Sequence, residues 1–267
     1  MELQYRLIAL DVDGTLLNDE HEVTPRVREA VRAVAGQGAE IVICTGRGST
    51  SALPVLRELG LKGTMITHNG ASVVDSETRR VIHDTVISHE QASLYTEYCL
   101  ERGIHFDMNT AFDLYVASIG EEAATMYRHL RARPILRGYE EGMPERLVKL
   151  SVFADKEVMD AIEKDWAGWE PVLQAIRSGD NFIDVQHPQA SKGRALERLA
   201  AIRGISREQV MAIGNYYNDT GMLQFAGRGV AMDNSPSGVK AVADEIAASN
   251  NEDGVAVVLE RLLAGIR

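Results

Sequence analysis

A short apolar run near the start of the chain ends directly in two carboxylates, and this junction restricts the folds open to the sequence. The run Leu7–Leu10 is followed by the segment DVDGT at residues 11–15. Four consecutive apolar residues suit a strand that is covered on both faces. Carboxylates at the end of such a strand are costly unless a cation compensates their charge. Magnesium would do so, because it prefers oxygen ligands and is often held by carboxylates.

The segment DVDGT by itself allows two interpretations. Asp11 could accept a phosphoryl group as a nucleophile, with Asp13 as its acid/base partner. Alternatively, the segment is only a strand-to-turn junction, because Asp and Gly both favour turns. Polar segments further along the chain bear on this choice.

The length and composition suit a globular protein that has no nucleic-acid or membrane partner. The 267 residues are enough for one large or two modest domains, and 45% of them are hydrophobic. The 28 Lys and Arg residues against 39 Asp and Glu residues give a net charge of −11. An acidic surface argues against broad binding to nucleic acid or to a membrane surface. It does not argue against a small anionic substrate, which a local cluster of donors can bind.

The cysteines and the N-terminal residues favour a cytoplasmic location. Cys44 and Cys99 lie far apart in apolar contexts and outside any CxxC pair, so we expect reduced core residues. Apolar runs stay shorter than the about 18 residues of a transmembrane helix. The N-terminus also lacks the basic region and apolar segment of a signal peptide.

Strands and helices alternate regularly in two separate parts of the sequence. Such strand–helix–strand units form parallel sheets with right-handed crossovers. We therefore predict a Rossmann-like parallel-sheet α/β core from residues 1–84 and 187–267. The predicted strands are 7–10, 39–44, 65–67, 210–213 and 229–232, and the helices begin near residues 25, 49, 192, 222 and 237, with a last one at 253–266.

Residues 85–186 have a different pattern, in which strands and helices are mixed without regular alternation. We predict that this part forms an inserted α+β domain. Its predicted helices are 88–101, 121–131 and 156–166, and its predicted strands are 104–108, 114–116, 146–153, 172–176 and 182–185.

Three further polar segments lie at the ends of predicted core elements. Thr45-Gly46-Arg47 follows a strand, where Thr45 could donate to phosphate and Gly46 would let backbone amides approach it. Lys192 stands in the first turn of a helix, where a cation opposes the helix dipole, so another partner is expected. Asn215 and Asp219 follow another strand and could reach one cation.

Purely structural interpretations compete with functional ones at three places in the sequence. A lone Arg is usually solvated, so we favour a surface role for Arg47. Asn69-Gly70 is a strong turn signal, so we favour a tight turn over a ligand role for His68 and Asn69. Lys192 alone would also be read as a solvated surface residue.

Four motifs in order, DVDGTLL, TGR, SKG and GNYYND, together resemble the haloacid dehalogenase (HAD) superfamily, most closely its Cof-type sugar-phosphatase branch. The resemblance covers the whole chain, including HNGA at 68–71 and SNNEDGVA at 249–256. It implies that the inserted domain is a cap that closes on the core and selects the substrate. The expected fold is therefore a Rossmann-like core with an inserted α+β cap at 85–186.

The resemblance also implies roles for the matching residues. Asp11 would be the nucleophile and a Mg²⁺ ligand, and Asp13 would be the acid/base, with its backbone carbonyl on the metal. Asn215 and Asp219 would complete the metal ligands. The residues expected to bind the phosphate are Thr45, Gly46, Lys192 and Asn218, of which Thr45 and Lys192 would also assist catalysis.

One position departs from the motif pattern. The family usually has Asp in GDxxND where this chain has Asn215. An amide oxygen can still bind a cation, but the site loses one negative charge, so we expect weaker magnesium binding than in the family.

The sequence thus predicts a magnesium-dependent phosphatase that acts on a small phosphomonoester, such as a sugar phosphate, through an aspartyl-phosphate. Two alternatives stay open: a phosphomutase, and a non-catalytic protein that binds a phosphorylated ligand because of Asn215. The sequence does not indicate which of Asn109, Asp113, Tyr115 or Arg137 selects the substrate, nor the oligomeric state.

Overall fold

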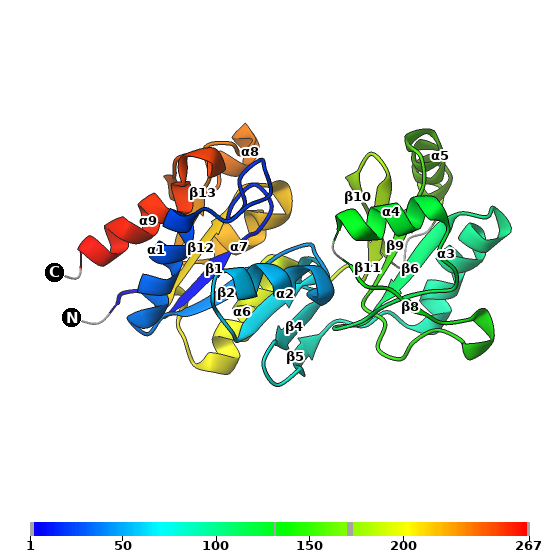
Figure 1. The fold of residues 1–267 in the computed structure, drawn as a ribbon, viewed down its shortest axis with the longest axis horizontal. Helices are drawn as coiled ribbons and strands as arrows, with labels where there is room; N and C mark the ends of the chain where they lie inside the picture. The colour runs from blue at the N-terminus through cyan, green and yellow to red at the C-terminus, as the bar shows by residue number, and fades with distance from the viewer. Residues whose placement is uncertain (1–2, 131, 170–172, 266–267) are drawn as a thin grey trace.

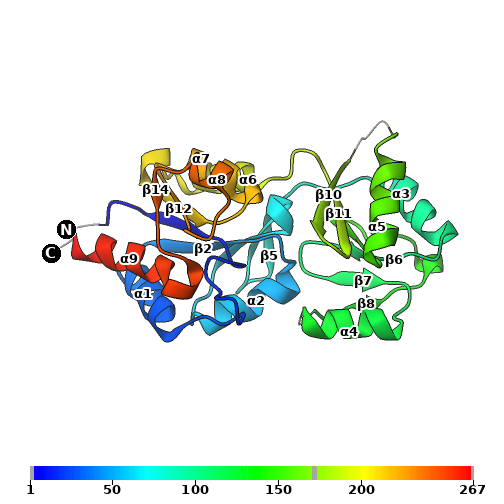
Figure 2. The same cartoon turned by 90° about the horizontal axis from the view of Figure 1, so that it is seen from above.

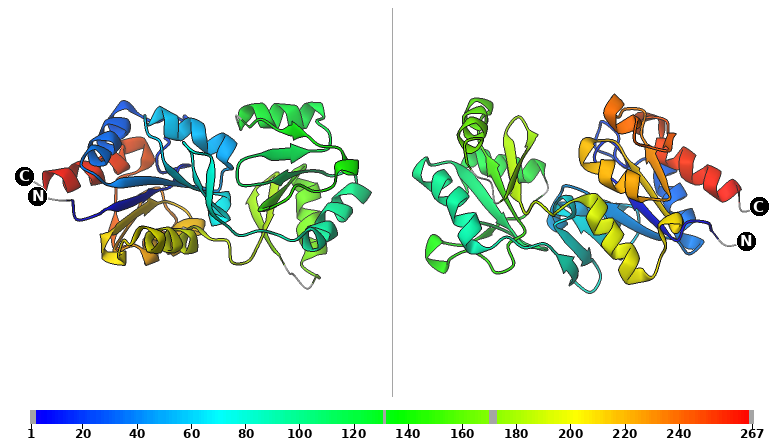
Figure 3. Two further views of the ribbon diagram at one scale, coloured as in Figure 1. Left: turned by 90° about the horizontal axis from the view of Figure 1, so that it is seen from below. Right: turned by 180° about the vertical axis from the view of Figure 1, so that it is seen from behind.

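Two lobes, each built on its own β-sheet, make up the molecule (Figure 1). The computed structural model describes residues 3–130, 132–169 and 173–265. We call the lobe with the eight-stranded sheet the core and the lobe with the six-stranded sheet the cap. Two segments cross from one lobe to the other, between β5 (Arg80–Asp84) and α3 (His89–Glu101) and between β11 (Phe182–Gln186) and α6 (Lys192–Arg203) (Figure 3).

The core sheet has the strand order β14-β13-β12-β1-β2-β3-β4-β5. The first six strands of this order are parallel to one another. At the end of the sheet, β4 pairs antiparallel with both β3 and β5. The chain order reverses between β1 and β12, which is where ligands bind in open α/β sheets. The strands are β1 (Leu7–Leu10), β2 (Glu40–Cys44), β3 (Thr64–Thr67), β4 (Ser72–Asp75), β5, β12 (Val210–Gly214), β13 (Arg228–Ala231) and β14 (Glu245–Ile246).

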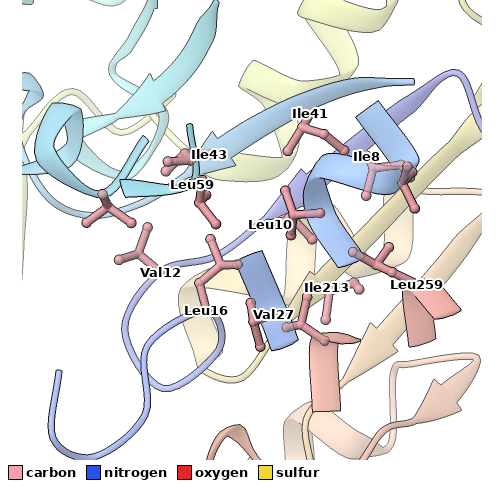
Figure 4. Packing of buried hydrophobic residues seen from close by; sticks show 14 of the residues in the cluster. Ile8, Leu10, Val12, Leu16, Val27, Ile41, Ile43, Leu59, Ile213 and Leu259 are labelled. Atoms are coloured by element: carbon pink, nitrogen blue, oxygen red, sulfur yellow. The ribbon is translucent and has the colours of Figure 1, made fainter. Parts of the chain in front are cut away.

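Strand β1 is covered on both faces, as its apolar run predicted. Ile8 and Leu10 join the cluster that contains Val27 and Leu259 (Figure 4), whereas Leu7 and Ala9 join a cluster on the opposite face. Helices therefore flank both sides of the sheet, and their bounds follow. α1 (Pro25–Gly36), α2 (Ser49–Glu58) and α9 (Gly254–Ala264) cover one face, and α6, α7 (Thr220–Phe225) and α8 (Ser237–Lys240) cover the other.

The cap sheet has the order β10-β11-β9-β6-β7-β8 and is mostly antiparallel. Helices α3 and α5 pack on its face away from the core (Figure 2), and α4 lies on the opposite face. The remaining bounds are β6 (His105–Asn109), β7 (Leu114–Val116), α4 (Glu121–His129), β8 (Ile135–Leu136), β9 (Lys149–Phe153), α5 (Lys156–Trp166) and β10 (Gln174–Gly179).

The predicted fold class, a parallel-sheet α/β core with an inserted α+β cap, is confirmed. The domain boundaries stay a prediction; in the structure, β5 ends at Asp84 and β11 ends at Gln186. Side-chain caps fix the starts of two helices: Thr24 caps α1 by accepting from the Val27 amide, and Ser88 and Gln91 form a capping box on α3.

Several predicted elements differ from the structure. The strand predicted for 146–153 begins at Lys149, because Arg146 has a φ of 57°, which a strand does not allow. Strands β4 and β5 were missed, as were β8 and β14, whose two residues carry little periodic signal. Parts of three predicted elements, at Arg131, Val172 and Ile266, lie outside the described residues.

Both cysteines are buried free thiols, as predicted. Across the described ranges, no helix has the length and apolar character needed to cross a membrane.

Candidate active site

The predicted site residues converge at the carboxyl ends of β1, β2 and β12, next to the point where the strand order reverses. Asp11 follows β1, Thr45 follows β2, and Asn215 follows β12. Lys192 is the first residue of α6, which Ser191 caps by accepting from the Arg194 amide. Neighbouring carboxyl ends of parallel strands bring these segments together although they are far apart in the sequence.

Lys192 is a buried cation between two buried carboxylates. Its side chain is 1% exposed, and its Nζ donates to Oδ1 of Asp11 at 2.7 Å and to Oδ1 of Asp219 at 2.6 Å. The surface alternative for this lysine is therefore wrong. A close approach holds it there, since a Cβ at Gly193 would lie 2.5 Å from the backbone carbon of Gly221.

The three charges strongly affect one another. Burial, together with the neighbouring Asp219 carboxylate, raises the pKa of Asp11, although Lys192 opposes this shift. Burial disfavours the charge of Lys192, but Asp11 and Asp219 outweigh it and raise the pKa of the ammonium. One ammonium thus faces two carboxylates. With both carboxylates ionised, the three groups carry one excess negative charge, which a further cation would balance.

Asp219 also organises the loop after β12. Its Oδ2 accepts from the backbone amides of Asn215 at 2.9 Å and Tyr216 at 3.0 Å. Each oxygen of this fully buried carboxylate therefore already has a donor. The structure brings Asp219 to Lys192 and to the loop amides, and its role as a metal ligand stays a prediction.

Asn215 lies against the oxygens that the resemblance assigns to a metal. One terminal atom of the amide, either its oxygen or its nitrogen, faces these groups. It is 3.0 Å from the Asp13 carbonyl oxygen, 3.1 Å from Asp11 Oδ2 and 3.3 Å from Thr15 Oγ1. With its NH₂ group turned toward them, the amide donates to all three atoms. With its oxygen turned toward them, Thr15 can donate to it, but the other two contacts join acceptors and need a cation between them.

The second orientation suits magnesium. Neighbouring oxygens in an octahedral Mg²⁺ shell lie about 2.9 Å apart, given metal–oxygen distances of about 2.0–2.1 Å. The distances from Asn215 to Asp13 and Asp11 are close to that value. Within the described ranges, no three His, Cys, Asp or Glu side chains gather as a metal site, so a site here depends on the Asp13 carbonyl and the Asn215 amide.

Arg47 lies at the surface, as favoured, but it pairs with Asp13 instead of standing alone in solvent. Arg47 Nε is 2.8 Å from Asp13 Oδ2, and its Nη2 is 2.5 Å from Asp13 Oδ1. Both groups of this bidentate pair stay partly accessible, with side-chain exposures of 27% and 51%. The guanidinium fixes the direction of a carboxylate that can still reach solvent or a ligand.

The phosphate-binding candidates form a second cluster beside the carboxylates. Thr45 is buried, and the backbone amide of Asn69 donates to its carbonyl at 3.1 Å. Asn218 Nδ2 donates to Asn69 Oδ1 at 3.0 Å, and a Cβ at Gly46 would meet the same oxygen at 2.9 Å. The structure thus brings Thr45, Gly46 and Asn218 together around Asn69.

The predicted turn at His68–Gly70 is confirmed as a short 3₁₀ turn, and its Asn69 side chain also contacts the candidate site. Both polar side chains are buried, and Asn69, at a φ of 55°, bonds to Asn218. Sequence analysis missed Asn69 and Arg47 as site residues. The available signal was their place at the carboxyl end of a strand, beside residues already assigned to the site.

Comparisons with known proteins place the chain in a family. The model of the haloacid dehalogenase-like hydrolases matches residues 8–259. The chain is 35% identical to YxeH of Bacillus subtilis, covering 97% of this chain and 98% of that protein. It is 29% identical to the 5-amino-6-(5-phospho-D-ribitylamino)uracil phosphatase YwtE of the same organism, covering 97% and 99%.

Solved structures agree with this assignment. A haloacid dehalogenase-like hydrolase from Bacteroides thetaiotaomicron superimposes with a TM-score of 0.88 at 27% identity, covering 97% of this chain and 99% of that one. The HAD subclass IIB sugar phosphatase BT4131 does so with a TM-score of 0.80 at 26% identity, covering 98% and 100%. The chain therefore belongs to the haloacid dehalogenase-like hydrolases, in their Cof-type branch, and the prediction that it is a hydrolase is confirmed.

Proposed function

We propose that the protein hydrolyses a small phosphomonoester, such as a sugar phosphate, through an aspartyl-phosphate on Asp11 and with magnesium. The observation that supports this most directly is the buried Lys192 ammonium between Asp11 and Asp219. Phosphoryl transfer requires placement and charge neutralisation above all, and a fixed buried cation supplies both. The phosphatase names of the relatives support the same reaction class.

Asp11 is the proposed nucleophile. Its Oδ1 is held by Lys192, whereas its Oδ2 faces only the Asn215 amide among the described contacts. Attack of a carboxylate oxygen on phosphorus forms the aspartyl-phosphate and breaks the bond to the leaving alcohol oxygen. Water then attacks phosphorus, which releases phosphate and restores the carboxylate.

Asp13 is the proposed acid/base, and Arg47 positions it. Asp13 would give its proton to the leaving alcohol oxygen and would later take a proton from the attacking water. The bidentate contact from Arg47 limits the rotation of the Asp13 carboxylate. Thr45, Gly46, Lys192 and Asn218 would hold the phosphate oxygens, and Asn69 would orient Asn218.

Magnesium would be held by Asp11, the Asp13 carbonyl and Asn215, with Asp219 nearby. When bound, it would neutralise charge on the phosphate and on the carboxylates. The substrate would be a small phosphorylated metabolite rather than nucleic acid, in line with the net charge of −11. The free thiols of Cys44 and Cys99 support a reducing compartment such as the cytoplasm.

A second candidate is a non-catalytic protein that binds a phosphorylated ligand. The neutral amide of Asn215, which can satisfy the metal-binding oxygens by itself, supports it. Tight binding of inorganic phosphate without any turnover would be its signature.

The test is phosphate release from p-nitrophenyl phosphate, measured with magnesium and with a chelator. We expect turnover in the parent that needs magnesium and that falls by at least about 10³-fold in Asp11→Asn. Asp19→Asn is the matched control, since Asp19 lies in the next loop and contacts Asn250 and Asn251 instead. Absence of turnover in the parent at high magnesium would contradict hydrolysis and favour the binding protein. Transfer of the phosphoryl group from Asp11 back to the sugar, detected in a mutase assay with a sugar bisphosphate as activator, would instead indicate a phosphomutase.

A further inference from the structure

One face of the cap sheet is apolar, and the other face is apolar under α4 but polar beside it. Leu150, Val152, Ile183 and Val185 point to the cluster under α3 and α5. Side chains alternate between faces along a strand, so the residues between them point to the other face, which is turned toward the core and α4 (Figure 2). The register of β6, β9 and β11 orders these residues into rows: Asn109, Lys149 and Gln186 form the first row, and Asp107, Ser151 and Asp184 form the second.

The two rows form a buried network. Lys149 Nζ lies 3.1 Å from Asp184 Oδ1, and Ser151 donates to the same oxygen at 2.9 Å. Asn109 Nδ2 is 2.5 Å from Asp107 Oδ1. Five of the six side chains belong to buried residues. Burying an ion pair adds little stability over an apolar pair of similar volume, so stability alone does not explain this network.

The first row lies beside the catalytic side of the core. Val148, which precedes Lys149, packs against Ala71 of the core and Ala190. Burial, and then the charge of Lys149, lower the pKa of His68, whereas a hydrogen bond with the backbone of Thr110, the residue after Asn109, opposes the shift. His68 adjoins Asn69, the partner of Asn218 in the candidate site. Side chains of the first row therefore continue the site into the cap.

Two buried polar atoms in this region lack a partner among the described residues. They are Oε1 of Gln186, in the first row, and Nδ1 of His68, in the core. Both residues are at most 2% exposed. Gln186 donates to the Ala190 carbonyl, and Ala190 packs against Ala71 in the turn that contains His68. Buried polar atoms are normally paired, so an acceptor and a ring nitrogen left free on the two sides of this contact point to a polar ligand.

We propose that the first row and Asp184 recognise the hydroxyl groups of the substrate's leaving group, and that they select a neutral polyol monophosphate over a molecule with a second anionic group. This inference rests on the proposed phosphatase function. A hydroxyl both donates and accepts, and the rows offer carboxylate and amide acceptors beside ammonium and amide donors. Two carboxylates face one ammonium, so the network repels a second anion.

The chain provides a matched pair of lysine–aspartate contacts for the test. Lys149 and Asp184 form the buried contact, and Lys156 and Asp160 form an exposed one on α5, at 2.7 Å. We would compare Lys149→Gln and Asp184→Asn with Lys156→Gln and Asp160→Asn, after thermal unfolding has shown that each variant is folded. The probes are glucose 6-phosphate, sorbitol 6-phosphate, fructose 1,6-bisphosphate, p-nitrophenyl phosphate and inorganic phosphate.

The first readout is the ratio of kcat/KM for each polyol monophosphate to kcat/KM for p-nitrophenyl phosphate. We expect Lys149→Gln to lower this ratio by at least about 10-fold, mainly through KM, because a donor to the leaving group is lost. Asp184→Asn should raise turnover of the bisphosphate relative to the monophosphates by a similar factor. The α5 variants should keep the parent's ratios. Ratios that stay within about twofold of the parent in both buried variants would overturn the proposal.

A binding measurement keeps the test independent of catalysis. In calorimetric titrations, the parent should bind at least one of the two monophosphates more tightly than inorganic phosphate, and Lys149→Gln should lose this difference. If neither binds more tightly than inorganic phosphate, the proposal is overturned even where p-nitrophenyl phosphate is hydrolysed. If the difference is present but nothing is hydrolysed, the phosphatase function fails and the recognition role stands.

Discussion

Asn215 holds a neutral amide against Asp11 and the Asp13 carbonyl, where the motif pattern of this family carries a carboxylate. Because an amide has a donor end and an acceptor end, it can satisfy these oxygens without a cation or join them in binding one. A carboxylate has only acceptors and would need the cation. We therefore expect the amide to lower the dependence of the folded site on metal.

Asn215→Asp should increase the affinity for magnesium and decrease the stability of the metal-free protein. The added charge faces Asp11, so we expect about 1–3 kcal/mol lower free energy of unfolding in chelator. The half-saturating magnesium concentration should fall by about 10-fold, because affinity rises with ligand charge. Urea unfolding at a series of magnesium concentrations measures both effects.

Asn234→Asp is the control for this change. Asn234 donates to the Gly14 carbonyl in the neighbouring loop at 2.8 Å, so its replacement costs a hydrogen bond without adding to the ligands. Its magnesium requirement should match that of the parent. If Asn215→Asp needs as much magnesium as the parent, the account of Asn215 is wrong.

At the scale of elements, two close approaches set the position of Lys192, the proposed phosphate-binding lysine. Helix α6 starts against the turn after β3, where a Cβ at Gly70 would lie 2.2 Å from the Ser191 carbonyl oxygen. It also starts against α7, where Gly193 meets Gly221. These contacts place the first turn of α6, and Lys192 with it, over the strand ends.

Gly193→Ala should destabilise the protein and displace Lys192. The new Cβ would meet backbone rather than a flexible side chain, so we expect a loss of about 1–3 kcal/mol in the free energy of unfolding and lower activity. Gly36→Ala is the matched control, because Gly36 ends α1 with open space around its Cβ position. That change should be neutral or stabilising by up to about 1 kcal/mol. Equal stability of the two variants in urea would contradict the close approach.

The polar face of the cap sheet should make stability depend on pH. Burial raises the pKa of Asp107 from 3.8 to about 6, although Lys149, Asn109 and Tyr127 oppose the shift. The folded state then holds this proton more tightly than the unfolded state, so its stabilising contribution is full below pH 4 and is lost as pH rises to 6. About two pKa units correspond to about 3 kcal/mol.

Asp107→Asn removes this titration. The free energy of unfolding of the parent minus that of Asp107→Asn should therefore fall between pH 4 and pH 6 and level off above it. Denaturant unfolding at half-unit pH steps measures the difference. A constant difference would show that folding leaves the pKa of Asp107 unshifted, and a difference that rises with pH would show that folding lowers it.

At the scale of the whole molecule, the lobes have separate hydrophobic cores. The core sheet packs in two clusters and the cap in two others. Apolar contact between the lobes is small among the described residues: the trio Ala71, Val148 and Ala190, and the loop after β6, whose Ala111 packs against the core and accepts from Ser49 through its carbonyl. Two ion pairs, Arg146 with Asp84 and Arg79 with Asp113, also join them. Lobes joined in this way can unfold and move separately.

Calorimetric unfolding should accordingly show two transitions. Leu150→Ala in the cap should lower one of them and Leu259→Ala in α9 the other, since each removes a buried side chain from one cluster, at about 2–5 kcal/mol. A single transition that both variants lower equally would mean that core and cap unfold as one unit. It would also contradict the predicted domain division.

The sequence by itself determined the fold class, the family and most of the helices and strands, and it predicted the candidate site residues. Apolar runs, caps and breakers act over a few residues, so strands such as β1 and helices such as α1 could be predicted from neighbours in the chain. The motifs identified Asp11, Thr45, Lys192 and Asp219 because each follows or begins such an element.

Tertiary structure decided the contacts between distant residues. Lys192 and Asp11 are 181 positions apart, Asn218 and Asn69 are 149 apart, and even Arg47 and Asp13 are 34 apart. Whether a polar side chain is buried, and against what, depends on how strands pair and helices cross, which no local pattern specifies. For this reason the burial of Lys192, the pairing of Arg47 and the polar rows of the cap became visible only in the folded chain.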